Sequence, residues 1–344
     1  MRIAVDAMGG DFAPREIVKG AVQAAESGAQ VLLVGDEARV EEEFRTLGLP
    51  RNGIDIVHAA EVIPMGEHTQ QAVRRRGSSI AVACDLVKSG EAQGMFSAGN
   101  TAATMALCKI RIGAIPGIAR PAIATVLPTR TGLIVILDVG ANVDCSATNL
   151  IQFALMGSVY AEAVLGIAHP RVGLLSIGEE EGKGNELTRA AYDVIAESGL
   201  NFKGNVEGRA IFSGEFDVVV CDGFAGNVVL KVSEGVAEMT MGAIKEEARR
   251  SILNRVPMRQ LRGVFARVRN RMDYAEYGGA PLLGVRGVSI IGHGRSHARA
   301  VANAVIKARQ TVEGDVVGRI ARSPLIAELG ENRTPAGAQM REAL

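Results

Sequence analysis

The most informative stretch of the chain is LIVILDVGANVD, residues 133–144. Its five leading aliphatic residues predict a strand over 133–138 that is covered on both faces, as strands of parallel sheets are. A glycine-containing loop follows, and the pattern over 147–165 is that of a core helix. A buried strand, a loop and a helix in this order form the repeating unit of an α/β protein.

The same alternation extends in both directions along the chain. Strands are predicted at 2–7, 30–35, 54–58, 94–97, 122–127, 133–138, 172–177, 217–221 and 288–291. Helices are predicted at 14–27, 37–47, 70–89, 147–165, 185–197, 227–250 and 297–312. This pattern predicts a doubly wound, mostly parallel sheet in a three-layer α/β/α domain over residues 1–313. Residues 314–344 are predicted to form a C-terminal segment that is poorly ordered toward its end.

Composition and charge exclude several classes of protein. The chain has 344 residues, of which 47% are hydrophobic, and this excludes a disordered protein. Its 38 basic and 38 acidic residues balance, so nucleic-acid binding has no support. The four cysteines are far apart and outside metal-ligand spacing, which predicts reduced thiols and no metal site. Asp6 interrupts any N-terminal export signal, and no stretch has the length and apolarity of a membrane span.

Glycine and small polar residues follow the predicted strands at six places. These loops are residues 6–11, 97–101, 138–144, 178–186, 222–227 and 292–297. Glycine lets the backbone approach a ligand, and N–H groups at a helix start favour an anion. Each loop alone is explained as an ordinary turn. Six of them, expected at the same edge of one sheet, predict a site for a small anion, with phosphate as the favoured ligand.

Several common motifs are absent from the sequence. There is no GxxxxGK[ST] motif, and the first strand is not followed by GxGxxG. Neither a GxSxG elbow nor an HExxH zinc motif occurs. A P-loop nucleotidase and an ordinary dinucleotide site are therefore unsupported.

Five motifs together resemble one family. They are VDAMGGD at 5–11, SAGNT at 97–101, LDVGANVD at 137–144, DGFAGN at 222–227 and YGGAPLLG at 277–284. In this order they resemble the bacterial phosphate acyltransferase of phospholipid synthesis. The resemblance implies a fold related to phosphotransacetylases and isocitrate-dehydrogenase-like enzymes. It also implies a homodimer without a metal or organic cofactor.

The activity that this resemblance implies is an acyl transfer. A long-chain fatty acyl group passes reversibly from acyl-acyl-carrier-protein to inorganic phosphate, and the acyl-phosphate serves glycerol-3-phosphate acylation in phospholipid synthesis. Because this product has a membrane destination, we expect a cytoplasmic enzyme peripherally associated with the inner face of the cell membrane. The membrane glycerol-3-phosphate acyltransferase is a further expected partner.

One segment has an uneven charge. Residues 245–271 hold nine basic and two acidic residues, and Pro257 divides an amphipathic pattern. A basic helix pair is therefore predicted at 245–273. It suits a solvated surface, a dimer interface, the acidic carrier protein or an anionic membrane, and we favour the membrane. The residues predicted to make this contact are Arg249, Arg250, Leu253, Arg255, Leu261, Phe265 and Arg269.

Attack of phosphate on a thioester needs no protein nucleophile. The protein must position phosphate and stabilise the oxyanion that forms at the carbonyl, which donor groups can do. The predicted catalytic residues are His293, Asn142, Asn227 and Lys183. The predicted phosphate- or substrate-binding residues are Gly9, Gly10, Ser97, Asn100, Thr101, Asn185 and Ser296. The carboxylates predicted to orient other donors are Asp6, Asp144 and Asp222, because unpaired they would repel phosphate.

Two points stay open at this level. His293 is either a proton carrier or a structural residue. The family usually has two small hydroxyl residues after His293-Gly294, whereas this chain has Arg295-Ser296, so the role of Arg295 is undecided.

Two other classes of function remain as alternatives. A dehydrogenase on a related fold would need the dinucleotide fingerprint that is missing. A non-catalytic lipid- or carrier-binding module would explain the segment at 245–273, but it would leave six polar loops without a purpose.

Overall fold

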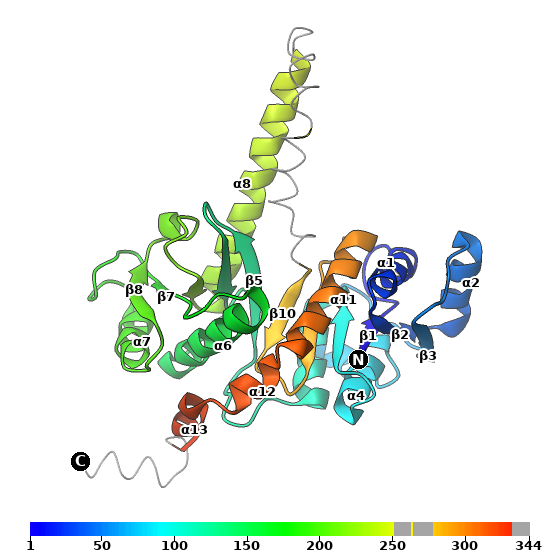
Figure 1. The fold of residues 1–344 in the computed structure, drawn as a ribbon, viewed down its shortest axis with the longest axis horizontal. Helices are drawn as coiled ribbons and strands as arrows, with labels where there is room; N and C mark the ends of the chain where they lie inside the picture. Colours follow the sequence, from blue (N-terminus) through cyan, green and yellow to red (C-terminus); the bar gives the residue numbers. More distant parts are fainter. Residues whose placement is uncertain (251–262, 264–277, 332–344) are drawn as a thin grey trace.

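The computed structural model describes residues 1–250, 263 and 278–331 (Figure 1). Its strands are β1 (Arg2–Asp6), β2 (Gln30–Gly35), β3 (Ile54–His58), β4 (Gly94–Ser97), β5 (Ala122–Pro128), β6 (Leu133–Leu137), β7 (Val172–Leu175), β8 (Phe202–Val206), β9 (Val218–Val220), β10 (Ala280–Leu283) and β11 (Val288–Ile291). Its helices are α1 (Arg15–Glu26), α2 (Glu37–Leu47), α3 (Thr69–Ala72), α4 (Ser79–Ser89), α5 (Thr101–Leu107), α6 (Ala147–Leu165), α7 (Glu186–Ala196), α8 (Gly223–Arg250), α11 (Ala298–Glu313), α12 (Val316–Ala321) and α13 (Pro324–Glu331). A π-helical turn, η1 (Cys108–Ile112), continues α5, and η2 (Gly208–Ala210) is a 3₁₀ turn.

The described strands form one 11-stranded sheet in the order β3-β2-β1-β4-β11-β10-β5-β6-β9-β7-β8. Most neighbours are parallel, which confirms the predicted doubly wound, mostly parallel sheet. The exceptions are β10 against β11, β10 against β5, and β5 against β6, all antiparallel.

These three reversals turn the two halves of the sheet in opposite directions. The carboxyl ends of β1, β4 and β11 therefore lie at one edge, and those of β6, β7 and β9 lie at the other. The expectation that all six glycine loops share one edge is wrong. The sequence pattern of a buried strand does not reveal its direction, so it could not have shown this.

Helices cover both faces of the sheet (Figure 1). On one face, α4, α5, η1 and the start of α8 enclose a single apolar core that includes Ile80, Leu107 and Val219. On the other face, α1 and α11 pack over the first half of the sheet, and α6 packs over the second half. The molecule is thus a three-layer α/β/α structure, as predicted.

Several element boundaries differ from the sequence prediction. The helix predicted at 70–89 is divided into α3 and α4, because Ser78 ends the intervening turn and its hydroxyl caps α4 by accepting from Ala81 N. Helix α8 begins at Gly223 instead of 227, because the Asp222 side chain accepts from Ala225 N at 2.8 Å and caps it. Strands β8 and β10, which lack long apolar runs, were not predicted.

The C-terminal segment is partly built into the domain. Residues after 313 form α12 and α13, and Val316, Ile320 and Ile326 are buried in the core under α6. Residues 332–344 lie outside the described part of the chain.

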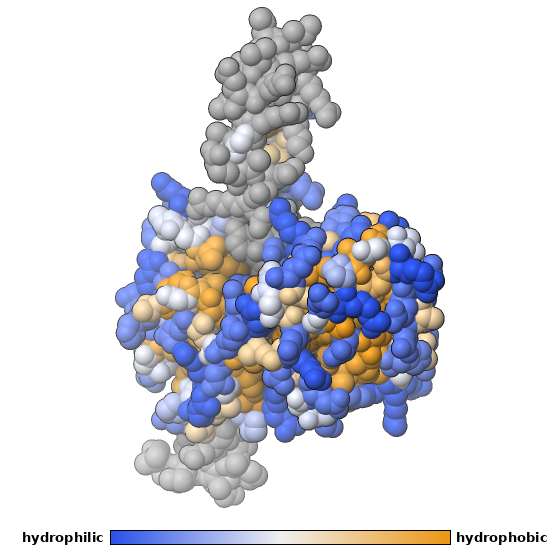
Figure 2. Space-filling view, turned by 45° about the vertical axis from the view of Figure 1, so that its right-hand side comes forward, coloured by the Kyte–Doolittle hydropathy of each residue, from blue (hydrophilic) through white to orange (hydrophobic). Residues whose placement is uncertain are grey.

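The predicted basic helix pair falls mostly outside the described residues. Arg249 and Arg250 end α8, the long helix that projects from the body in Figure 1, and Leu253, Arg255, Leu261, Phe265 and Arg269 are not described. Figure 2 shows the surface of the body, with apolar side chains visible between hydrophilic ones. Within the described ranges, no helix combines the length and apolarity needed to cross a bilayer.

Candidate active site

The loops after β1, β4 and β11 form a first polar group. Asp6, fully buried at the end of β1, accepts from Ser97 Oγ at 2.7 Å and from Met8 N at 3.1 Å. Ser97 Oγ in turn accepts from Gly99 N at 3.0 Å. Burial raises the pKa of Asp6, while these donors oppose the shift. Both side chains therefore hold the loop backbones together.

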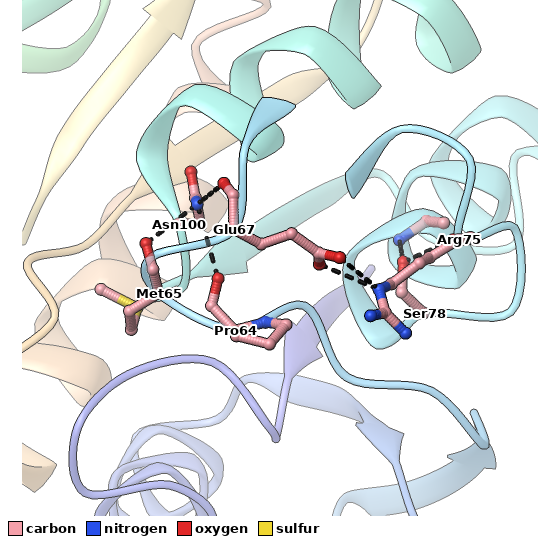
Figure 3. A network of polar contacts seen from close by, with 7 residues as sticks. Pro64, Met65, Glu67, Arg75, Ser78 and Asn100 are labelled. Carbon is pink, nitrogen blue, oxygen red and sulfur yellow. Dashed lines mark hydrogen bonds and ion pairs between the residues drawn. The ribbon is translucent and has the colours of Figure 1, made fainter. Parts of the chain in front are cut away.

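Asn100, predicted to bind substrate, has a structural task at the start of α5 (Figure 3). Its Oδ1 accepts from Ala103 N at 3.0 Å and caps the helix. Its Nδ2 donates to the carbonyl oxygens of Met65 and Glu67, at 2.9 Å each. Glu67 is itself held by Arg75, whose Nε lies 2.9 Å from both carboxylate oxygens. Asn100 thus fastens the 64–67 segment to the end of β4.

We expect Asn100→Asp to separate these two tasks. Aspartate keeps the oxygen that caps α5, but it presents an acceptor to the carbonyls of Met65 and Glu67, which costs about 1–3 kcal/mol locally. In hydrogen–deuterium exchange, peptides covering 64–67 should exchange faster while α5 stays protected. Unchanged exchange over 64–67 would contradict this role of Asn100.

The remaining members of the first group surround Gly10. Gly10 has φ +105° and packs against the Gly294 carbonyl oxygen, which accepts from Asp11 N at 2.8 Å. His293 is exposed, and its Nδ1 accepts from Arg295 N at 3.2 Å. The predicted binders Gly9 and Ser296 are buried in these loops, whereas Thr101 is exposed.

A carboxylate already stands at the start of α11. Glu16 Oε2 accepts from Ala298 N at 3.0 Å, and the hydrogen bond from Lys19 lowers the pKa of Glu16. A negative charge at this helix start disfavours a second anion there. The first group is therefore a less suitable phosphate site than its glycines suggest.

The loops after β6 and β9 form a second polar group around Asp138. This side chain is fully buried, and burial raises its pKa. Its Oδ1 accepts from Ile123 N at 3.0 Å and from Ala141 N at 3.1 Å, and its Oδ2 accepts from Asn142 N at 2.6 Å. One carboxylate thus fixes the loop after β6 to the start of β5.

Asn142 belongs to the same network. Its Nδ2 donates to Asp138 Oδ2 at 3.0 Å and to the Pro121 carbonyl oxygen at 2.8 Å, so both amide hydrogens are used within the protein. The predicted donation from Asn142 to a reacting carbonyl or phosphate is not compatible with these contacts. Asn227, by contrast, is exposed and lies beside Gly140.

A cavity of about 460 Å³ opens next to this group. Its lining residues are Ala119, Arg120, Asp144, Cys145, Ser146, Thr148 and Asn149. Ser146 caps the 19-residue helix α6, whose positive end faces this region. Within the described part of the chain, the Arg120 guanidinium makes no hydrogen bond or ion pair. An uncompensated guanidinium beside a helix N-terminus is suited to an anion.

Cys145 in this cavity is not an activated thiol. The pKa of the Cys145 thiol is raised to about 11, mainly by burial and to a smaller extent by the nearby Asp138 carboxylate. We expect Cys145 to react with iodoacetamide at pH 7.5 about two orders of magnitude more slowly than an ordinary peptide thiol, because its thiolate is scarce. The rate, followed by peptide mass spectrometry, should keep rising up to about pH 11. A plateau near pH 8 would contradict this prediction, and the protein unfolded in urea supplies the reference rate.

The loop after β7 lies at the same edge of the sheet as the second group, because β7 is next to β9 and parallel to it. Lys183 and Asn185 are exposed, and Asn185 Oδ1 accepts from Thr188 N at 2.9 Å as the cap of α7. The predicted residues therefore lie at two edges of the sheet instead of one.

Two residues of the second group were missed by the sequence analysis. Asp138 lies inside the LDVGANVD motif at 137–144, but the apolar run before it predicts only that a strand ends there. Arg120 lies in no motif, and only the fold places it beside the start of α6.

Comparison with known proteins identifies the relatives of this chain. Residues 1–319 match the family model described as "Fatty acid synthesis protein". A phosphate acyltransferase of Pelotomaculum thermopropionicum is 53% identical over 327 residues, covering 94% of this chain and 95% of the relative. A phosphate acyltransferase of Desulforamulus reducens is 52% identical over 328 residues, covering 94% and 97%.

Solved structures agree at the level of the fold. A phosphotransacetylase from Streptococcus pyogenes superposes with a TM-score of 0.63 at 18% identity, covering 91% of this chain and 94% of that one. The family match and the curated relatives extend over nearly all of the chain. The chain therefore belongs to the phosphate acyltransferase family of fatty acid and phospholipid synthesis, and it is an acyl-transferring enzyme.

Proposed function

We propose that this enzyme transfers a long-chain acyl group from acyl-acyl-carrier-protein to inorganic phosphate, reversibly, and releases acyl-phosphate. The observation that carries the proposal is the cavity at the start of α6, in which Arg120 has no partner within the described chain. Its position beside the loops after β6 and β9 supports a site that takes a small, doubly charged anion.

In this proposal, phosphate lies between Arg120 and the first turn of α6. A phosphate oxygen attacks the thioester carbonyl carbon, the tetrahedral intermediate collapses, and the carrier thiolate leaves. The helix N-terminus, the Thr148 hydroxyl and the guanidinium orient the nucleophile and offset its charge. Asp144 lines the same cavity, and because its carboxylate would repel phosphate, we propose that it orients a donor of this loop and does not contact the anion. Asp138 and Asn142 act as positioning residues that hold this loop.

Other predicted residues keep their proposed roles outside this cavity. Asn227 and Asp222, at the start of α8, border the second group, and Lys183 would approach from the loop after β7. His293 remains the candidate for proton transfer or hydrogen bonding, with Gly9, Gly10 and Ser296 around it. Their participation requires the substrate to extend beyond the cavity.

We also propose a homodimer that binds peripherally to the inner face of the cell membrane. Helix α8 supports the dimer, because it exposes apolar side chains at three- and four-residue spacing. These are Phe224, Val228, Val232, Val236 and Met239. The segment at 245–273 is the proposed membrane contact, and the membrane glycerol-3-phosphate acyltransferase is the proposed acceptor of the product.

The direct test is to incubate the protein with palmitoyl-acyl-carrier-protein and phosphate. Mass spectrometry should show free carrier thiol and acyl-phosphate forming together, and only when phosphate is present. Thiol release without acyl-phosphate would indicate a thioesterase. No turnover by protein with an intact circular dichroism spectrum would overturn the proposal and favour a binding module.

A further inference from the structure

A group of exposed basic residues lies around α4 and η1, at the side of the body opposite to the projecting end of α8 (Figure 1). Arg74 and Arg76 stand between α3 and α4, Lys109 lies in η1, and Arg286 follows β10. All four side chains are exposed, and none has a hydrogen-bond or ion-pair partner among the described residues. We call these four residues, with Ile110, the α4–η1 basic patch.

Contacts between the three segments show that the segments adjoin one another. The Nη2 atom of Arg111 donates to the Arg76 carbonyl oxygen at 3.4 Å, which joins the turn before α4 to η1. The Arg286 guanidinium lies against Gly113, one residue after η1. A Cβ on Gly287 would touch Val87 of α4 and Ile112 of η1.

The patch keeps a net positive charge after its acidic neighbours are included. Asp85 is paired with Arg111 and offsets that residue alone. Glu67 is paired with Arg75 in the turn between α3 and α4, and Glu61 lies beside Gly77. Ile110, next to Lys109 in η1, is 65% exposed and adds an apolar side chain to the patch. A charged surface around one exposed aliphatic residue has the composition of a docking site for an acidic protein.

The patch is also connected to the cavity. Residues 113–120 run from the end of η1 to Arg120, and Ala114 pairs with Val285 on the way. Gln152 holds this path by donating to the Gly117 carbonyl oxygen at 2.8 Å and accepting from Ala119 N at 2.9 Å. Seven residues span at most about 25 Å, which limits the distance from Gly113, against which Arg286 lies, to Arg120.

We propose that the α4–η1 basic patch docks the acidic acyl carrier protein and presents its thioester-bearing arm to the Arg120 cavity. This inference rests on the proposed function for the identity of the carrier. Docking itself needs no turnover, because it depends on charge complementarity between the two protein surfaces.

The test reverses charge on the patch and measures carrier binding directly. In isothermal titration with carrier protein that lacks an acyl group, Arg74→Glu with Arg76→Glu should raise Kd at least tenfold and flatten its salt dependence. The matched control is Arg39→Glu with Lys203→Glu, two exposed basic residues on α2 and β8, which should leave Kd unchanged.

Kinetics then separate this inference from the proposed function. The patch variant should raise KM for acyl-acyl-carrier-protein tenfold or more, with no change in KM for phosphate or in turnover of a small S-acyl-pantetheine donor. Equal carrier binding by the patch and control variants would overturn the docking site. An equal loss of turnover with acyl-acyl-carrier-protein and with S-acyl-pantetheine would overturn it as well. A wild-type protein that binds carrier through the patch but forms no acyl-phosphate would overturn the proposed function alone.

Discussion

Replacing Arg120 with alanine is expected to lower kcat/KM for phosphate by about 10²–10³-fold. The guanidinium is the cation of the cavity and has no partner within the described residues, so its removal takes away charge directed at the ligand. Arg120→Lys should recover part of the activity, because it restores the charge but not the two-pronged hydrogen bonding of a guanidinium. The measurement is initial rate against phosphate concentration at a saturating acyl donor.

A matched control and a binding measurement complete this test. Arg39→Ala removes an exposed arginine from α2 and should leave the phosphate dependence unchanged. Isothermal titration of phosphate should show weaker binding to Arg120→Ala than to wild type. If phosphate binding and kcat/KM both survive the loss of Arg120, the phosphate site lies elsewhere.

Replacing Asp138 with alanine is expected to destabilise the protein by about 4 kcal/mol or more. The substitution leaves the buried N–H groups of Ile123 and Asn142 and the half-buried N–H of Ala141 without their acceptor, and each orphaned buried donor costs about 1–3 kcal/mol. Urea denaturation followed by circular dichroism measures the change in the free energy of unfolding. Asp55→Ala, an exposed carboxylate on β3, should change it by no more than about 0.5 kcal/mol.

The pH dependence of Asp138→Asn gives an independent readout. Burial raises the pKa of Asp138 in the folded state above the ordinary value of 3.8, so the folded protein binds the proton more tightly than the unfolded chain does. The stability contributed by this group is therefore present at low pH and is lost as pH rises through the folded-state pKa. Asparagine does not titrate, so the stability of wild type relative to Asp138→Asn should fall as pH rises above 3.8. Parallel curves for the two proteins would contradict the shift.

The sequence was sufficient for the layers and for most of the helices. Apolar runs such as 133–137 and the helical pattern of 147–165 indicate which residues are buried. The spacing of those buried residues distinguishes strands from helices. The direction of a strand depends on how its connections cross the sheet. The antiparallel placement of β5 and β10 therefore was not predicted, and this placement separated loops that were expected to meet.

The candidate site was predictable by residue type but not by role. Asn100 and Asn142 were selected because amides donate hydrogen bonds, yet both donate to main-chain carbonyls of their own fold. Sequence spacing cannot show whether a donor faces a ligand or the backbone. Arg120 illustrates the reverse case, since its significance comes from the tertiary position of α6.

The position of β10 and β11 has a consequence for how the chain is synthesised. These late strands lie between β4 and β5, and no other described strand joins the two halves of the sheet. Until residues up to Ile291 have emerged from the ribosome, the nascent chain therefore has two incomplete sheets, with unpaired edges at β4 and β5. Contacts so distant in sequence close slowly, and open edges invite pairing with other chains. We expect fragments that end before residue 280 to aggregate rather than to fold as a smaller domain.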